Sequence, residues 1–318
     1  MNDLTRKQFV SGAIKVLAVS VLSPNFGLAT GTSTSQYPSC DRSVDSLVEK
    51  LSEQGIDVRP VVKDARFYPK ISNLFPTSEK KESVRKFYER LSPEKRTQIL
   101  EASVADYKRR TGFDTKCKEI HRFMYNNSYW LDKSVQEYVV PKELTSAVIG
   151  IESSFGAYPG KLEPAGVLVS LYRTAEDDRA EWAAKQLAGL ATFTMKKRIH
   201  PKALKSSHAA AIGHAQFIPT SLNTWFVGNN VYDMADCIMS AANYLSQHSV
   251  IYGSLEGAVF GYNHWDVYVQ TVLDLAYSAG MDKAARIGRN TPSLLRQCSE
   301  GNTSRSSPQI FPEVLPFL

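Results

Sequence analysis

The segment from Val140 to Gly156 (VPKELTSAVIGIESSFG) places the carboxylate of Glu152 beside the apolar stripe of a short predicted helix. We expect this helix to begin at Pro141 and to end at the glycine. Its apolar residues recur at the spacing of one buried helical face, namely Leu144, Ala147, Val148, Ile151 and Phe155. Glu152 lies at the margin of this stripe, where partial burial would raise its pKa and keep it protonated near neutral pH. Such a glutamate can act as a general acid, although a solvated glutamate at a helix edge is the commoner case.

Three later clusters combine small, polar and aromatic side chains, and they span residues 207–221, 232–245 and 261–268. Gln216 is flanked by small residues that let the backbone approach a ligand, and its amide can both donate and accept hydrogen bonds. Tyr244, Tyr262 and Tyr268 offer flat faces with hydroxyl tips, which suit the two kinds of surface on a sugar ring. The clusters indicate a carbohydrate groove, and the alternative for each tyrosine is a core aromatic with one polar end.

Four blocks, in this order, resemble the membrane-bound lytic transglycosylase B family of murein-cleaving enzymes: IESSFG, Ser207 with GHAQFIPTS, YDMADCIMSAANYL and GYNHWDVY. The resemblance covers roughly residues 120–276. It implies a mainly α-helical, lysozyme-like catalytic domain with an additional helical N-terminal region. It also implies that Glu152 is the sole catalytic acid and base, and that Ser207 hydrogen-bonds Glu152.

The same resemblance places Ser207 among the substrate-binding residues together with six others: Arg179, Gln216, Tyr244, Tyr262, Asn263 and Tyr268. Asp178 stands where the family's element has a second arginine, which changes how this site would hold the N-acetyl or peptide groups of a substrate. Long family members carry a calcium-binding loop rich in Asp and Gly, whereas residues 225–231 (WFVGNNV) contain no carboxylate. We therefore expect no Ca²⁺ site, no other metal site and no cofactor.

The reaction implied by the resemblance is non-hydrolytic cleavage of the MurNAc-β-1,4-GlcNAc bond in peptidoglycan, with a 1,6-anhydro product. No second carboxylate in the four blocks is positioned like a partner for Glu152, although Asp233 and Asp236 are not excluded by sequence alone. Two alternatives stay open. One is a hydrolytic muramidase on the same scaffold, and the other is a peptidoglycan-binding protein that has lost activity.

The ends of the chain suggest an exported protein. Residues 1–29 combine Arg6 and Lys7 with an apolar run and small residues at cleavage-like spacing, which predicts a signal peptide, while an uncleaved anchor on a membrane is the alternative. We expect a linker at 30–45, the helical N-terminal region at 46–119, the catalytic domain at 120–298 and a flexible tail at 299–318. The expected location is the periplasm or cell envelope.

The chain has 318 residues and a formal net charge of +6, which suits an anionic wall polymer. It contains no concentrated block of Lys and Arg, so nucleic acid is not an expected partner, and we expect a monomer. Four cysteines in an exported protein favour disulfides, and we prefer the pairs Cys117–Cys237 and Cys40–Cys298 among the three connectivities.

Helical patterns dominate the body of the chain. Ser92 with Pro93 predicts a helix to Arg110, Asp178 opens a run through Leu190, Asp233 caps a helix through Leu245, and a further helix follows Asp266. The segment 55–75 is the expected place for a short extended piece.

Overall fold

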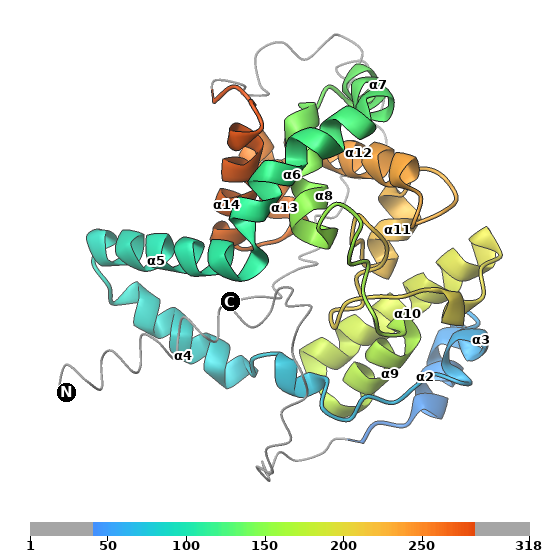
Figure 1. Cartoon of the computed structure of the whole chain (residues 1–318). Coiled ribbons are helices and arrows are strands. Elements are labelled where there is room, and N and C mark those ends of the chain that lie inside the picture. The colour runs from blue at the N-terminus through green and yellow to red at the C-terminus, as the bar shows by residue number, and fades with distance from the viewer. Residues whose placement is uncertain (1–40, 284–318) are drawn as a thin grey trace, which may run out of the picture.

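The computed structural model describes residues 41–283, and within this range the chain is mainly helical (Figure 1). The longer helices are α2 (Val44–Glu53), α4 (Ser78–Glu89), α5 (Pro93–Thr111), α6 (Phe113–Asn126), α7 (Ser128–Tyr138), α8 (Lys142–Ser153), α9 (Pro164–Thr174), α10 (Asp177–Lys197), α12 (Met234–Tyr252), α13 (Leu255–Tyr262) and α14 (Asp266–Ser278). The short ones are α3 (Arg59–Val62), η1 (Ser72–Leu74), η2 (Pro201–Ala203) and α11 (Pro219–Trp225). The predicted signal peptide, most of the predicted linker and the predicted tail lie outside the described residues.

Helix α8 is the central element of the upper half of the molecule in Figure 1, where α5, α6, α7, α12 and α14 pack around it or around each other. All ten residues from Leu144 to Ser153 are buried, so the helix has no solvated face in this stretch. The apolar stripe predicted from the sequence accounts for only part of this burial. The other faces are covered because neighbouring helices surround α8, which only the tertiary structure could reveal.

The lower half is built on the antiparallel pair α9 and α10, against which the N-terminal elements α2, α3 and η1 pack (Figure 1). Leu47, Leu51, Val58 and Val61 supply the apolar side chains of these N-terminal elements to the shared core. At the start of this segment Arg42 donates hydrogen bonds to the carbonyl oxygens of Tyr172 and Ala175 at 3.1 and 2.7 Å. The N-terminal segment therefore belongs to the α9–α10 half.

Helix α4 leads from this half to α5, which packs on α14 in the other half. The predicted N-terminal region at 46–119 is thus divided between the two halves of the molecule. Its predicted boundary with the catalytic domain, between residues 119 and 120, falls inside α6.

Most predicted helix starts agree with the structure. The Ser92 hydroxyl caps α5, the Asp233 carboxylate caps α12, and α14 begins at Asp266. Helix α10 begins one residue before the predicted Asp178, and Pro141 is the cap of α8 rather than its first helical residue.

The segment 55–75 holds α3 and η1 instead of the expected extended piece. The described residues contain no strand, and their extended contacts are three isolated β-bridges that join Leu162, Ser206, Ile212 and Phe217. These bridges fasten the loop after α8 to the long loop before α11.

The predicted disulfide between Cys117 and Cys237 is wrong, because both residues are free thiols in the structure. Cys117 packs on the core around α8 and α14, whereas Cys237 is buried in the core shared with α9 and α10. The Cys237 thiol donates a hydrogen bond to the carbonyl oxygen of Val231 at 3.2 Å. Cys40 and Cys298 lie outside the described residues.

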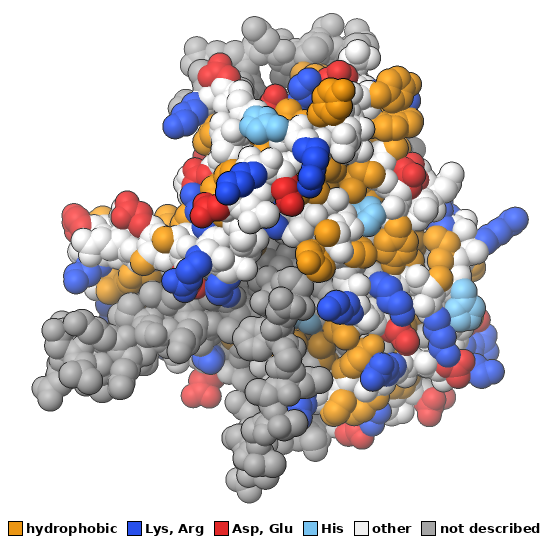
Figure 2. All heavy atoms as spheres, viewed as in Figure 1, with side chains coloured by type: hydrophobic (Ala, Val, Ile, Leu, Met, Phe, Trp, Pro, Cys, Tyr) orange, Lys and Arg blue, Asp and Glu red, His pale blue; other side chains and the backbone are white. Residues whose placement is uncertain are grey.

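Between residues 41 and 283 no helix is both long and apolar enough to cross a membrane. Basic and acidic side chains are interspersed with hydrophobic ones over the face shown in Figure 2.

Candidate active site

Glu152 is buried near the C-terminal end of α8, with 9% of its surface exposed. The hydroxyl of Tyr268 on α14 donates a hydrogen bond of 2.6 Å to its Oε1. Burial raises the pKa of Glu152 to about 7, and the hydrogen bond from Tyr268 opposes this shift. The carboxyl group is therefore poised to give up or accept a proton near neutral pH.

The turn that follows Glu152 has an unusual backbone. Ser154, Phe155 and Gly156 are consecutive residues with positive φ, at 50°, 58° and 91°. Such a conformation is costly for the two residues that carry a Cβ. The Phe155 ring folds back over Gly150, where an added Cβ would lie 2.6 Å from the ring. Gly150 thus allows the turn to close against α8 immediately after the candidate acid.

Three tyrosines surround Glu152, and two of them were predicted from the sequence. Burial is the main reason why the pKa of Tyr107, Tyr262 and Tyr268 is raised, and the charge of Glu152 raises the pKa of all three further. Tyr107 on α5 was missed, since it lies outside the four motif blocks. Its side chain is fully buried, packs edge-on against Trp265 at 5.0 Å, and its hydroxyl has no hydrogen-bond partner within the described chain. The helical spacing of Leu100, Val104 and Tyr107 predicts a buried position but no proximity to Glu152.

The loop that carries Gln216 is joined to the predicted tyrosines. The Tyr262 hydroxyl donates to the carbonyl oxygen of Ala215 at 2.5 Å, and the Phe217 ring lies 5.5 Å from Tyr262 and 5.6 Å from Tyr244. Tyr244 in turn donates to the carbonyl oxygen of Gly261 at 2.6 Å. The structure therefore brings Gln216, Tyr244 and Tyr262 together, and Tyr262 links this group to Glu152.

Gln216 is itself a strained and buried residue, with φ of 50° and 7% exposure. Its amide nitrogen donates to the carbonyl oxygens of Gly213 and Pro159 at 2.7 and 3.1 Å. These bonds fix the side chain in place and tie the Gln216 loop to the loop after α8.

Ser207 and Asn263 have surroundings that the sequence did not predict. The Ser207 hydroxyl accepts hydrogen bonds from the backbone N–H groups of Ala209 and Ala211, both at 3.3 Å. Its predicted bond to Glu152 is not among the hydrogen bonds of the described residues, and Tyr268 is the donor to that carboxyl group instead. The Asn263 amide oxygen is buried and lacks a hydrogen-bond partner within residues 41–283.

Arg179 is buried on α10, with its guanidinium 4.7 Å from the centre of the Phe75 ring and 5.1 Å from that of Trp182. Burial lowers its pKa, opposed by the charge of Asp178. Phe75 also lies 5.9 Å from the ring of His208, next to Ser207. The N-terminal segment thus reaches Arg179 and the Ser207 loop, a contact that no motif indicated.

The loop between α11 and α12, for which we predicted no calcium, is held by side chains. Asp236 accepts hydrogen bonds from the N–H groups of Asn229 and Asn230 at 2.8 and 2.9 Å. The ammonium of Lys197 donates to the carbonyl oxygen of Gly228 at 2.5 Å and to Asn229 Oδ1 at 3.2 Å. Within the described part of the chain no group of three His, Cys, Asp or Glu side chains could hold a metal ion.

Comparison with known proteins agrees with this architecture. The family model described as transglycosylase SLT domain matches residues 44–254. Membrane-bound lytic murein transglycosylase B of Escherichia coli (strain K12) is 32% identical over 129 residues, which are 39% of this chain and 36% of that protein. The chain thus matches about a third of the length of this relative.

Solved structures share the fold at low sequence identity. SltB3 from Pseudomonas aeruginosa, in complex with NAG-anhNAM-pentapeptide, superposes with a TM-score of 0.58 at 16% identity, over 81% of this chain and 86% of that one. The Escherichia coli lytic transglycosylase Slt35 in complex with bulgecin A superposes with a TM-score of 0.55 at 18% identity, over 73% and 91%. Since the family model covers most of the chain, including the helix that carries Glu152, the protein belongs to the transglycosylase SLT domain family.

Proposed function

We propose that this protein is a peptidoglycan lytic transglycosylase that cleaves the MurNAc-β-1,4-GlcNAc bond and leaves a 1,6-anhydro-MurNAc end. The observation that carries the proposal is Glu152, a buried carboxyl group with a pKa of about 7 whose hydrogen-bond donor is a tyrosine. The names of the relatives support the activity, and the structures of SltB3 with NAG-NAM-pentapeptide and NAG-anhNAM-pentapeptide support the substrate class.

In this mechanism Glu152 begins protonated and donates its proton to the oxygen of the scissile glycosidic bond. The bond breaks, and positive charge develops at C1 of the muramoyl ring. Glu152, now ionised, takes the proton of the C6 hydroxyl, whose oxygen closes on C1. The proton that Glu152 gives away is thus restored within one turnover, and no water is consumed.

A single carboxylate suffices for this route, whereas most glycosidases use a pair about 5 to 9.5 Å apart. The two aspartates that the sequence left open have other roles in the structure. Asp233 caps α12 through the N–H of Asp236, and Asp236 binds the N–H groups of the loop before α12. Glu152 is also the one carboxylate whose charge raises the pKa of Tyr262 and Tyr268.

Gln216, Tyr244, Tyr262 and Asn263 would position the sugar, with the buried Asn263 oxygen available as a hydrogen-bond acceptor for it. Arg179 and Ser207 would act on the substrate through the loop around Ser207, against which Phe75 of the N-terminal segment packs. We place the protein in the cell envelope, where its substrate lies, in line with the membrane-bound relative.

The test is to incubate purified protein with peptidoglycan and to analyse the released muropeptides by mass spectrometry, beside a Glu152→Gln variant. We expect products one water lighter than hydrolytic ones with the wild type and none with the variant. Products with reducing ends would show a muramidase, and binding to sacculi without release would show a non-catalytic binding protein. Either result would overturn the proposal.

A further inference from the structure

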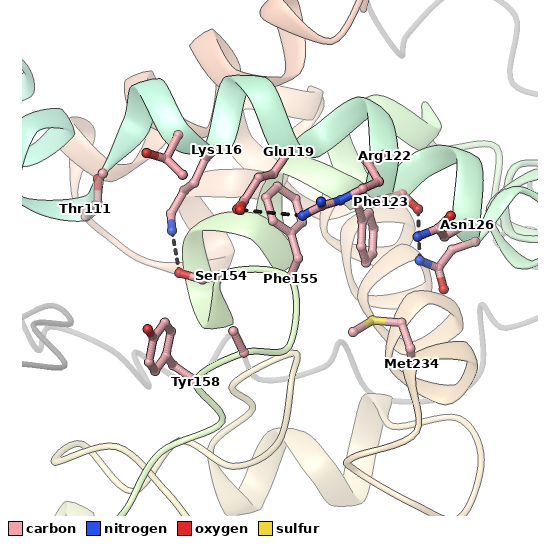
Figure 3. A pocket seen from close by; sticks show the side chains of 14 residues that line it. Thr111, Lys116, Glu119, Arg122, Phe123, Asn126, Ser154, Phe155, Tyr158 and Met234 are labelled. Atoms are coloured by element: carbon pink, nitrogen blue, oxygen red, sulfur yellow. Dashed lines mark hydrogen bonds and ion pairs between the residues drawn. The ribbon is translucent and has the colours of Figure 1, made fainter.

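A cavity of about 700 Å³ lies along α6 beside the last turn of α8 (Figure 3). Its polar lining includes Lys116, Glu119, Arg122, Asn126 and Asn127 on α6 and just after it, and Ser154 and Tyr158 beyond α8. Glu152 and the predicted substrate-binding residues are not among the residues that line it. The cavity is therefore a separate site that adjoins the turn behind the candidate acid.

Lys116 is the most unusual residue of this cavity, because its side chain is buried and forms no ion pair with a carboxylate within the described chain. The residue is 5% exposed, and its ammonium donates a hydrogen bond of 2.5 Å to the Ser154 hydroxyl. No carboxylate of the described residues lies within ion-pair distance of it. Burial lowers the pKa of Lys116, and the charge of Glu119 opposes this shift without cancelling it, so the burial of this cation is only partly compensated. Since an ammonium has three N–H donors, two remain for a ligand.

The remaining charges leave the cavity positive. Glu119 Oε1 faces Arg122 at 3.7 Å, and the Arg122 side chain is 74% exposed and extends along the cavity (Figure 3). Lys116 and Arg122 against Glu119 leave the lining of the cavity with one net positive charge. The amides of Asn126 and Asn127 and the half-exposed ring of Tyr158 supply hydrogen-bonding and apolar surface beside it. A buried cation next to amides and an aromatic face suits a carboxylate on a peptide rather than a neutral sugar.

We infer that this cavity binds a carboxylate of the stem peptide that peptidoglycan carries on its muramoyl residues. The inference rests on the proposed function for the choice of ligand. Ser154, which lines the cavity, is two residues from Glu152 in the chain, and a pentapeptide can extend by about 17 Å from the sugar that carries it. Lys116 contacts the carboxylate, Arg122 adds long-range attraction, and the Lys116–Ser154 bond joins the ligand to the turn that ends α8.

The inference is tested by binding rather than turnover, in the full chain carrying Glu152→Gln so that no product forms. The ligands are NAG-NAM-pentapeptide, the same disaccharide without peptide, and a pentapeptide form whose carboxylates are amidated. We expect the unmodified NAG-NAM-pentapeptide to bind about tenfold more tightly than the other two ligands. Lys116→Gln and Arg122→Gln should each reduce this preference, and Lys118→Gln, an exposed position on the same helix, should not.

Arg122→Gln changes an exposed side chain, so it stays informative if Lys116→Gln lowers the melting temperature. Equal binding of the three ligands, or a preference that neither substitution reduces, would overturn the inference while leaving the proposed function intact. Titration of the free pentapeptide into the wild type tests the peptide site independently of the proposed function. If it binds in a Lys116-dependent way while peptidoglycan is not cleaved, the proposed function fails and the peptide site stands.

Discussion

Glu152 is the residue on which the chemistry depends, and its environment makes the acid form available at neutral pH. A buried carboxylate without a cationic partner resists ionisation, and the donor that stabilises its charged form is the Tyr268 hydroxyl. The pKa of about 7 is a balance between these two effects, with burial the larger.

Replacing Glu152 by Gln should remove activity and stabilise the protein above neutral pH. The pKa of Glu152 rises from 4.5 in the unfolded chain to about 7 in the native state, so the native state loses stability as pH rises between these values. Glu152→Gln lacks this penalty. Its free energy of unfolding should exceed that of the wild type by up to about 3 kcal/mol at pH 8 and by much less at pH 5.

The measurement is denaturant unfolding of both proteins at pH 5 and pH 8. Glu143→Gln, in the first turn of the same helix, is the control and should show no comparable pH-dependent gain. An equal difference at both pH values would mean that the pKa of Glu152 is not raised.

Tyr268→Phe should move the pH dependence of the reaction. The lost hydroxyl stabilises ionised Glu152, so its removal should raise the pKa of Glu152 further and shift the alkaline limb of the kcat profile to higher pH. We also expect kcat to fall about tenfold, because the carboxyl group loses the hydrogen bond that orients it. Tyr277→Phe, on the same helix, should change neither quantity. An unmoved alkaline limb would show that Tyr268 does not tune Glu152.

At the scale of elements, α8 and the loops around it determine where the reacting groups lie. Helix α8 ends in three left-handed residues, and Gly150 gives the Phe155 ring the space to close this turn. The β-bridges at Leu162, Ser206, Ile212 and Phe217 then bring the Gln216 loop to the same side as Tyr262. The site is therefore built from one rigid helix and loops fastened to each other by backbone hydrogen bonds.

The loop before α12 should depend on a lysine and not on a metal. Lys197→Met removes the ammonium that binds Gly228 and Asn229, and it should lower the free energy of unfolding by about 1 to 3 kcal/mol. Lys196→Met, at the exposed neighbouring position, should change it by less than about 0.5 kcal/mol. Thermal melts with a chelator and with added Ca²⁺ should coincide. A lower melting temperature with the chelator would show that a metal does contribute.

At the scale of the whole molecule, the N-terminal segment completes the half that holds Arg179. Leu47 is 2% exposed in the core with α9 and α10, and Phe75 reaches both Arg179 and His208. The chain then crosses through α4 and returns as α5, whose Tyr107 lies near Glu152. Phe75, which precedes α4, and Tyr107, which follows it, thus lie beside predicted site residues although both are outside the motif blocks.

Leu47→Ala should destabilise the protein by about 2 to 5 kcal/mol, because it leaves a cavity between α2 and the α9–α10 pair. Below the melting temperature kcat should change little, since Leu47 is not among the residues that contact the Glu152 site. Glu49→Ala, exposed on the same helix, serves as the control, and urea unfolding measures both variants. An unchanged unfolding midpoint for Leu47→Ala would mean that the N-terminal segment does not contribute to this core.

The sequence by itself determined the helical class, the starts of α5, α12 and α14, and the identity of Glu152, Gln216, Tyr262 and Tyr268 as candidate residues. These features depend on local information: caps, apolar spacing and short motifs are properties of neighbouring residues. The order of the four blocks also indicated a family before any contact was known.

The tertiary structure alone decided which groups meet. It placed Tyr107 near Glu152 and kept Cys117 and Cys237 in different cores. It also directed the Ser207 hydroxyl to an N–H group of its own loop and buried Lys116 beside Ser154. The physical reason is that burial and pairing depend on residues far apart in the chain, and the burial of α8 by its neighbours sets the pKa of Glu152.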